Sequence, residues 1–489
     1  MRRVRPAPPA ALLLPLDPQR VEPLYRQLYE ALRVAVLSGR IAPGATLPST
    51  RALAAELRVS RNTVLLAFDQ LAAEGYLEGA ARSGTRVARG FTAGSRPSPA
   101  PGAAAGGLLS VRGRAIAGSP MPALSRGGSA PRPFRAGVPA LDAFPRALWA
   151  RLTARRWRQG PALDYGDPSG FLPLREAVAE YVRAARGARC GADQVLVVSG
   201  SQQGVDLASR VLLDPGDEVW MEDPGYHGAR IALLAAGATV VPVPVDDEGL
   251  AVEAGRRLAP RARVAYVSPS HQFPLGVTMS AARRLELLRW AAQAGAWVLE
   301  DDYDSEFRYD ARPLASLQGM DEDGRVIYVG TFSKTLFPAL RLGYLVVPEG
   351  LIDAFRAVRA AADRHSPTMD QAVLADFLAG GHFARHVRRM RRLYQERHDV
   401  LVAAIRDRLE GRLHARPSPA GMHLVGWLPP GADDLAASAA AASVGLEAAP
   451  LSWYSAGAPP SRGGLLLGWA GYAPAEIVEG VGRLAGVLR

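Results

Sequence analysis

From residue 134 onward, short apolar segments typical of buried strands alternate with amphipathic segments typical of helices. Val195–Ser199 is apolar up to its last residue, and Gln202–Leu213 follows it with helical periodicity after a Gly-Ser turn. Ala281–Ala294 is a second helix of this kind. The alternation predicts a mainly parallel α/β sheet covered by helices on both faces. The other predicted strands are Glu218–Met221, Thr239–Val245, Val264–Ser268, Ala296–Glu300, Val326–Val329 and Tyr344–Val347.

A chain of 489 residues, 48% of them hydrophobic, is long enough for about three globular domains at ~150 residues each. One stretch of 45 residues is dominated by Gly, Pro, Ala, Ser and Arg, contains no acid, and is predicted to be a flexible linker. The predicted organisation is a disordered lead-in at 1–20, an α-rich domain at 21–88, the linker at 89–133, a large α/β domain at 134–370 and a smaller lobe at 371–489.

The net positive charge of the chain comes from its first third. Residues 1–133 contain 18 Arg against seven Asp or Glu, whereas the remaining residues hold 40 basic and 40 acidic side chains. This asymmetry predicts a polyanionic partner for the N-terminal part, the alternative being a basic tail that only aids solubility. A single cysteine, Cys190, excludes an intramolecular disulfide framework and is typical of a cytoplasmic protein. No apolar run approaches the ~20 residues of a membrane span.

Residues 22–77 are predicted to form three helices. The first is an amphipathic helix within Glu22–Gly44, closed by a Gly/Pro turn. Ser49 and Ser60 are then the predicted N-caps of two short helices around a tight turn at Val59–Ser60. Such a pair forms a helix-turn-helix, in which the start of the second helix meets base edges and phosphate. Arg61, Asn62 and Thr63 occupy that start, and a basic hairpin wing is predicted at Leu77–Val87, with Arg82, Gly84 and Arg86.

Residues 21–88 resemble the winged helix-turn-helix of GntR-type regulators over nearly their full length. The resemblance implies double-stranded DNA as the partner of this domain. It implies contacts to DNA by Arg51 in the P-S-T-R turn, by Arg61, Asn62 and Thr63, and by the wing glycine Gly84. Some relatives carry a further basic residue where this chain has Leu65, so no contact is assigned there. A helical hairpin used only for dimerisation is the alternative interpretation.

Lys334 is the only lysine in a chain that carries 57 arginines. A position that needs only positive charge can become arginine, whereas one that needs an amine to condense with an aldehyde cannot. Together with the surrounding G-T-F-S-K-T-L-F-P-A-L-R-L-G, this favours attachment of pyridoxal 5'-phosphate (PLP) over a surface lysine that simply persisted.

PLP also requires an acid for its ring nitrogen, a donor for its phenolate, a stacking face and groups for its phosphate. In W-V-L-E-D-D-Y-D, Asp301 or Asp302 ends a strand at the carboxyl edge of the sheet, where ligands bind. Tyr303 is the predicted phenolate donor, and Tyr226, in E-D-P-G-Y-H-G, is the predicted stacking ring. The S-G-S-Q-Q-G turn offers backbone N–H groups to phosphate. The other phosphate candidates are Ser201, Thr331 and Arg341.

The segments Y-G-D-P-S-G-F-L-P-L-R, S-G-S-Q-Q-G, D-P-G-Y, S-P-S-H-Q-F-P-L-G, E-D-D-Y-D-S-E-F and T-F-S-K-T-L-F-P-A-L-R-L-G resemble fold-type I aminotransferases across about residues 134–489. Behind a GntR-type reader, the whole chain resembles a MocR/GabR-type transcription regulator. The resemblance implies a homodimer in which Lys334 holds PLP as an internal aldimine. It implies that Asp301, with Asp302 as the alternative, pairs with the ring nitrogen. The other implied PLP contacts are Tyr303, Tyr226, Ser201, Gln202, Thr331 and Arg341.

Two positions depart from the aminotransferase pattern. The asparagine that usually precedes P-T-G is replaced within His271–Gly276, so its contact to the phenolate is not carried over. GABA-responsive relatives carry an arginine two residues after the stacking tyrosine, where this chain has Gly228. Arg462 and Arg230 are the candidate replacements for binding an effector carboxylate, and PLP itself is a candidate effector.

The favoured hypothesis is a cytoplasmic transcription regulator that senses an amino compound or PLP through Lys334. The alternative is a working aminotransferase whose N-terminal domain tethers it to DNA. No metal site is expected, because His382 and His386 lack the glutamate of an H-E-x-x-H motif. The arginine-rich segment Arg385–His398 is interpreted as a solvated or interdomain face.

Overall fold

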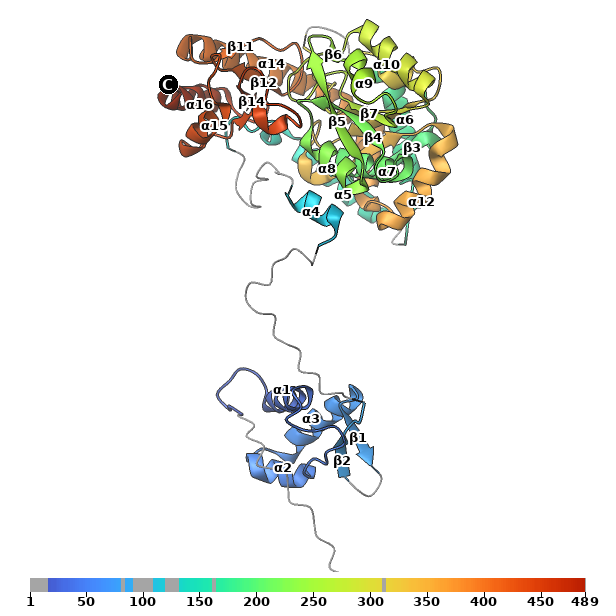
Figure 1. Ribbon diagram of the computed structural model, residues 1–489, viewed down its shortest axis with the longest axis vertical. Helices are drawn as coiled ribbons and strands as arrows, with labels where there is room; N and C mark the ends of the chain where they lie inside the picture. The colour runs from blue at the N-terminus through green and yellow to red at the C-terminus, as the bar shows by residue number, and fades with distance from the viewer. Residues whose placement is uncertain are drawn as a thin grey trace, which may run out of the picture. The chain divides into compact units, whose positions relative to one another are not determined.

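The structure is a computed structural model that describes residues 16–80, 84–90, 109–118, 132–160, 164–309 and 314–488. The chain divides into two compact units, one within residues 1–107 and the other within 108–489 (Figure 1). Residues 1–15 of the predicted lead-in, and 91–108 and 119–131 of the predicted linker, lie outside the described residues. The part of the linker stretch that is described contains one helix, α4 (Val111–Gly118), which belongs to the second unit.

The first unit has the predicted winged helix-turn-helix fold. The Ser60 side chain accepts a hydrogen bond from Thr63 N, and the Ser49 side chain accepts one from Ala52 N, so both predicted N-caps are present. Leu28, Leu53 and Val64 meet in a buried core. Its elements are α1 (Leu24–Leu37), α2 (Thr50–Leu57), α3 (Arg61–Ala73), β1 (Leu77–Ala80) and β2 (Gly84–Val87), with the two strands antiparallel.

An eight-stranded sheet forms the centre of the second unit, in the order β3-β10-β9-β8-β7-β4-β5-β6. Pairing is parallel from β9 through β8, β7 and β4 to β5, whereas β10 and β6 run antiparallel to their neighbours, which confirms the predicted mainly parallel sheet. The strands are β3 (Val195–Val198), β4 (Glu218–Asp223), β5 (Thr239–Asp246), β6 (Gly249–Leu250), β7 (Val264–Val267), β8 (Trp297–Asp302), β9 (Val326–Thr331) and β10 (Gly343–Val346).

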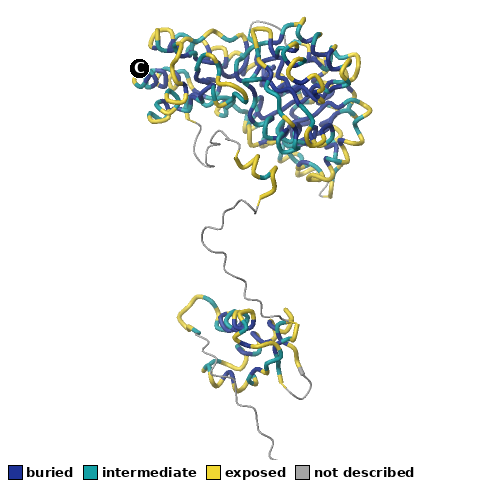
Figure 2. The backbone as a smooth tube through the Cα atoms, viewed as in Figure 1, coloured by how far each residue is buried: buried dark blue, intermediate teal, exposed yellow. Residues whose placement is uncertain are grey.

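Helices cover both faces of this sheet because its strands are apolar on both sides. Val195 and Val197 pack into one core with α6 and α13, whereas Leu196 and Val198 pack into another with α7 and α12. Buried backbone is accordingly concentrated in the interior (Figure 2). The helices are α5 (Arg146–Arg158), α6 (Leu172–Arg186), α7 (Ser201–Leu212), α8 (His227–Ala236), α9 (Val252–Leu258), α10 (Ala281–Ala294), α11 (Leu317–Met320), α12 (Ile352–Asp363) and α13 (Thr368–Ala379).

A smaller lobe lies beside the large sheet within the second unit (Figure 1). Phe134 is fully buried in its core and pairs with Gly468, so the chain begins this unit in the lobe that also ends it. Its elements are α14 (His382–Arg408), β11 (His414–Ala415), β12 (His423–Trp427), α15 (Asp434–Ser443), β13 (Ala449–Pro450), β14 (Gly464–Gly468) and α16 (Pro474–Val487). Among the described residues, no helix combines the length and apolarity needed to cross a membrane.

Candidate functional site

The lysine predicted to react with PLP lies against the chain segment that enters the second unit. Lys334 Nζ donates a hydrogen bond of 3.0 Å to the carbonyl oxygen of Gly137. A Cβ atom on Gly137 would come within 2.6 Å of Nζ, so a side chain at this position would displace the amine. Burial lowers the pKa of Lys334, although the nearby Asp304 carboxylate opposes the shift. The lowered pKa favours the neutral amine, which is the nucleophilic form.

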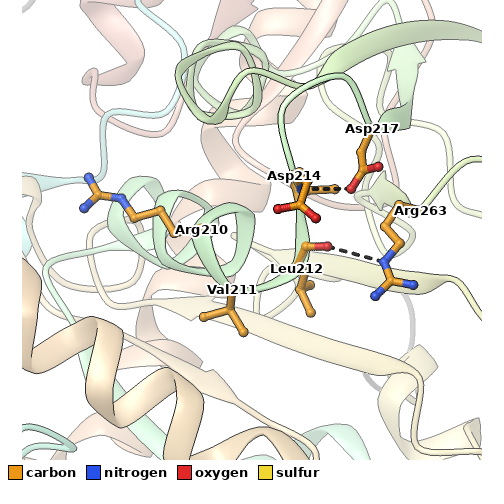
Figure 3. Close-up of a pocket in the computed structure, with 7 residues that line it drawn as sticks. Arg210, Val211, Leu212, Asp214, Asp217 and Arg263 are labelled. Carbon is orange, nitrogen blue, oxygen red and sulfur yellow. Dashed lines mark hydrogen bonds between the residues drawn. The ribbon is translucent and has the colours of Figure 1, made fainter.

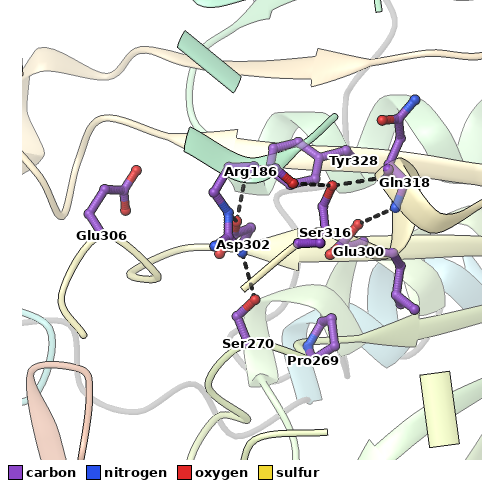
Figure 4. Close-up of polar contacts among 12 residues, drawn as sticks. Arg186, Pro269, Ser270, Glu300, Asp302, Glu306, Ser316, Gln318 and Tyr328 are labelled. Carbon is purple, nitrogen blue, oxygen red and sulfur yellow. Dashed lines mark hydrogen bonds and ion pairs between the residues drawn. The ribbon is translucent and has the colours of Figure 1, made fainter. Parts of the chain in front are cut away.

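Two adjacent acids at the end of β8 have different environments. Asp302 Oδ2 accepts hydrogen bonds from the buried Arg186 guanidinium at 2.6 Å and from the Tyr328 hydroxyl at 2.5 Å (Figure 4). Asp301 Oδ2 accepts one hydrogen bond of 2.5 Å from Tyr266, while its buried Oδ1 has no partner among the described residues. Burial raises the pKa of Asp301 to about 7. Asp302 Oδ1 is also without a partner among the described residues, so the two acids differ in their Oδ2 contacts. Asp302 is paired with a guanidinium, whereas Asp301 contacts only a hydroxyl and is left without a counter-charge of its own.

Tyr303 contacts a histidine of H-Q-F-P-L-G, the segment that differs from the aminotransferase pattern. Its hydroxyl lies 2.9 Å from His271 Nδ1, which also lies 3.0 Å from Asp304 Oδ2. A buried carboxylate favours the tautomer with a proton on Nδ1. In that tautomer the tyrosine oxygen accepts, and its own proton is free to donate to a ligand. Asp304 is the last acid of W-V-L-E-D-D-Y-D, but no role was assigned to it from the sequence.

His423 of the smaller lobe forms a buried cluster with His271 and Asp304. One ring nitrogen of each histidine and one carboxylate oxygen of Asp304 lie within 4.8 Å of one another, close enough to bind a metal ion. Burial lowers the pKa of His423 well below its usual value, and the neighbouring His271 contributes to the shift. Since His271 Nδ1 already contacts Tyr303 and Asp304, we assign the cluster to hydrogen bonding around the tyrosine. His382 and His386, where no metal site was expected, are not part of this cluster.

The S-G-S-Q-Q-G turn joins β3 to α7 and meets a cation. Gly200 has φ +93° and is followed by Ser201 as the first residue of α7. Arg341 Nη2 donates to Ser199 O at 2.7 Å, and a Cβ on Gly200 would lie 3.2 Å from the same nitrogen. A helix N-terminus beside a guanidinium is suited to a phosphate group. Thr331, also predicted here, is buried at the end of β9, where its hydroxyl accepts from Ser333 N.

Tyr226 lies directly before α8 and contacts Phe273 edge-on, with ring centroids 5.8 Å apart. Gln202 Nε2 donates to Gly228 O at 2.7 Å. A Cβ on Gly228 would lie 2.5 Å from the Tyr226 hydroxyl and 2.4 Å from Gln202 Oε1. A side chain at position 228 would therefore have to displace the ends of both neighbouring side chains.

The two candidate effector arginines lie in different settings. Arg462 donates from Nε to Leu428 O at 2.6 Å, and its guanidinium lies over the Trp427 ring at 5.9 Å. Arg230 is partly buried on α8, four residues after Tyr226. This bond uses only Nε of Arg462, so its Nη1 and Nη2 groups can still donate to a carboxylate.

The candidate DNA-contacting residues lie on the surface of the first unit. Arg51 is exposed in the first turn of α2, and Arg61 and Asn62 are exposed at the start of α3. Thr63 is partly buried and shares a 2.8 Å hydrogen bond with the Ser60 hydroxyl. Gly84, which opens β2 with φ +92°, is also exposed, whereas the predicted wing residue Arg82 lies outside the described residues.

A surface pocket of about 300 Å³ lies elsewhere in the second unit (Figure 3). Asp217 and Arg263, which line it, directly precede β4 and β7. It is therefore at the amino edge of the sheet, opposite the edge that carries Asp301. Asp214 N donates to Asp217 Oδ2, and Arg263 Nε donates to Leu212 O.

Comparisons with known proteins match both units. Residues 24–87 match the family described as "Bacterial regulatory proteins, gntR family", and residues 135–449 match "Aminotransferase class I and II". The probable rhizopine catabolism regulatory protein MocR of Rhizobium meliloti is 43% identical over 96% of this chain and 95% of its own length. The chain belongs to the MocR-type family of GntR regulators. The HTH-type regulator TauR of Rhodobacter capsulatus, 37% identical over 95% of this MocR-type chain and 96% of its own, shares the same extent.

Solved structures match the second unit of the MocR-type chain. A Pyrococcus horikoshii kynurenine aminotransferase has a TM-score of 0.68 and 30% identity, covering 73% of this chain and 91% of its own. The α-aminoadipate aminotransferase LysN of Thermus thermophilus, complexed with N-(5'-phosphopyridoxyl)-L-leucine, has a TM-score of 0.68 and 29% identity, covering 78% and 96%. The second unit thus has the predicted fold-type I aminotransferase fold.

Proposed function

We propose that this protein is a PLP-dependent transcription regulator that binds double-stranded DNA and senses an amino compound or PLP itself. The observation that carries the proposal is the buried Asp301 carboxyl, which has only a tyrosine hydroxyl as partner, in a site that also presents the only lysine of the chain. This site follows a GntR-type reader. When bound, PLP supplies an aldehyde that condenses with amines and a ring that withdraws electrons. The expected location is the cytoplasm, where DNA and free amino compounds meet.

The residues of the second unit fit PLP. Lys334 holds the cofactor covalently, Asp301 Oδ1 accepts from the ring nitrogen, and Tyr303 donates to the phenolic oxygen. Tyr226 packs on the ring. Buried surroundings exclude water from the acid, so its charge acts at low dielectric. The phosphate is assigned to Ser201, Gln202, Thr331 and Arg341, of which Ser201 lies at a helix N-terminus and Arg341 contacts the same turn.

The reader binds DNA through exposed groups at the start of α3 and at the wing. We assign base-edge or phosphate contacts to Arg51, Arg61, Asn62, Thr63 and Gly84. A homodimer would present two such readers, and the spacing of two half-sites would then depend on how the second units respond to ligand. This dependence gives the effector a physical route to regulation.

Two effector classes remain in the proposal. An amino compound with a carboxylate would be held by Arg230 or Arg462. PLP as its own effector is supported by the relative PdxR of Corynebacterium glutamicum, 32% identical over 85% of this chain and 86% of its own, which is named as a pyridoxine biosynthesis regulator.

A second candidate function is catalysis of transamination. It is favoured by the complete amine–acid–tyrosine set and by 31% identity to aromatic-amino-acid aminotransferase 1 of Thermococcus litoralis, over 61% of this chain and 73% of that enzyme. Transfer of the amino group from a defined donor to a defined acceptor over many turnovers would support this function.

The deciding experiment is a binding measurement at one fixed salt concentration, because phosphate contacts alone give salt-sensitive non-specific affinity. Purified full-length protein is titrated onto its own upstream intergenic DNA and onto scrambled DNA, with and without PLP. Selective binding that changes with PLP, and no longer changes in Lys334→Ala, supports the regulator. Equal affinity for both DNAs in every state contradicts it for that site.

A further inference from the structure

The second unit carries a concentrated basic surface that the proposed function does not use. Helix α5 and residues 382–395 of α14 each contain five arginines and no acid. This segregation stands out because residues 134–489 are neutral as a whole. The exposed members, here called the α5–α14 surface, are Arg146, Arg151, Arg155, Arg158, Arg385, Arg388, Arg389 and Arg392.

The two helices pack into one core through Leu152 of α5 and Phe383 of α14, and α14 also contacts the residues directly before α5. Arg389 of α14 donates to the carbonyl oxygen of Ala143, just before α5. Phe144 meets the His386 ring edge-on, with centroids 6.0 Å apart. Burial lowers the pKa of His382 at the start of α14, and Arg385, Arg151 and Arg155 lower it further. Arginines from both helices therefore act on the same imidazole.

The charge of this surface is only slightly compensated. Asp376 of α13 accepts from Arg155 at 2.7 Å and from Arg156. Asp142 pairs instead with the buried Arg397 at 3.3 Å. In the described parts of the chain, no carboxylate lies within 4.0 Å of Arg151, Arg388 or Arg392. These three side chains are free to meet an external anion.

The arginines of α14 form a stripe, because their spacing of three and four residues places them on one helix face. The opposite face buries Phe383, His386, Val387 and Met390, so the stripe faces solvent. Along α5, residues 146–158 extend roughly 18 Å at 1.5 Å per residue. Duplex DNA carries one charge per ~1.7 Å of axis, so a surface of this size faces several phosphates.

We propose that the α5–α14 surface binds the phosphate backbone of duplex DNA outside the site contacted by the reader. Guanidinium groups bind phosphate oxygens in bidentate geometry. Contacts to phosphate are the same in every DNA sequence, so these arginines would not read bases. The inference rests on the proposed function, since DNA is the polyanion that the reader brings to this protein. It adds a contact that strengthens binding without contributing to sequence choice.

The test compares two triple variants of the full-length protein. Arg151→Gln/Arg388→Gln/Arg392→Gln removes three unpaired charges from the surface. Arg257→Gln/Arg261→Gln/Arg289→Gln removes three equally exposed arginines from the α9–α10 side and serves as the matched control. Affinity for the whole upstream intergenic fragment, and for the shortest fragment that the wild type still selects, is measured as a function of salt.

The surface variant is expected to bind the long fragment at least about fivefold more weakly, with a salt slope reduced by about 2 to 3, since each phosphate contact contributes about 0.9. Its preference for upstream over scrambled DNA should persist. The short fragment and the control variant should show little change. Equal affinities and slopes for both triple variants on the long fragment would overturn the proposal.

Two further arms separate other outcomes. Arg61→Ala/Asn62→Ala should lose sequence selectivity but should still bind the long fragment with a steeper salt slope than the short one. A wild type that does not prefer upstream DNA would contradict the proposed function rather than the role of this surface. The surface variant and the wild type are also compared for binding to vesicles of anionic phospholipid. If the surface variant loses vesicle binding while its salt slopes on DNA equal those of the wild type, the surface binds another polyanion and the proposal is overturned. Arg151→Gln/Arg158→Gln, confined to α5, replaces the triple variant if the latter does not fold.

Discussion

The hydroxyl of Tyr303 lies 2.9 Å from Nδ1 of His271. His271 belongs to the segment in which aminotransferases usually carry an asparagine near the phenolate, and its ring nitrogen reaches the tyrosine instead. Asp304, 3.0 Å from the same nitrogen, sets the direction of the hydrogen bond. The departure from the family pattern is thereby compensated by a buried pair that positions the tyrosine.

Replacing His271 by Phe should weaken PLP binding about fivefold, because Tyr303 loses the partner that orients its proton, and one such hydrogen bond contributes roughly 1 kcal/mol. His271→Asn retains a polar partner and should lose less. Absorbance titration of the purified protein with PLP measures both affinities. Equal affinities for wild type and the phenylalanine variant would show that His271 does not position Tyr303.

The two adjacent acids should fail in different ways. Asp302→Asn should destabilise the second unit by roughly 3 to 5 kcal/mol, because the buried Arg186 loses its counter-charge. Asp301→Asn should leave the protein folded but reduce its affinity for PLP. Thermal unfolding and PLP titration of both variants provide the comparison. Loss of PLP affinity only in a folded Asp302→Asn would reassign the ring nitrogen to Asp302.

Lys334→Arg should abolish covalent PLP attachment while it preserves the positive charge. The variant is expected to lose the visible absorbance of the bound cofactor and the response of DNA binding to PLP. Its affinity for DNA without PLP should match that of the wild type. A PLP response that survives in Lys334→Arg would mean that non-covalent binding is sufficient for sensing.

The PLP-free protein should become less stable as pH rises from about 5 to 8. Burial raises the pKa of Glu222, Glu300 and Asp301 to about 7, above the unfolded values near 4. In that window the folded protein binds more protons than the unfolded chain, so the free energy of unfolding falls with pH, by about 1 to 3 kcal/mol per group.

The melting temperature between pH 5 and 8 measures this effect. Burial raises the pKa of Glu306 to about 7 as well, so Glu222→Gln removes one of four such groups and should flatten the dependence. A substitution of the exposed Glu253 should not. An unchanged slope in Glu222→Gln would show that this carboxyl does not take up a proton in the folded state.

Local patterns in the sequence were sufficient for most of the architecture. Ser60 caps α3 through a contact three residues away, and the valine-rich segment at 195–198 is apolar on both faces, so both elements could be predicted. Helix α4 was not foreseen, since its segment has weak periodicity. The choice between Asp301 and Asp302 was left open, because adjacent acids at a strand end differ only in what folds against them.

By itself, the sequence determined the N-terminal reader fold and the mainly parallel sheet, because periodicity and capping act over a few neighbours, and it singled out the sole lysine as a candidate. Only the tertiary structure decided that Arg186 pairs with Asp302 and not with Asp301, and that His271 meets Tyr303. These pairs join residues 32 and 116 positions apart. Contacts at such separations arise from the packing of sheet and helices, which no local pattern encodes.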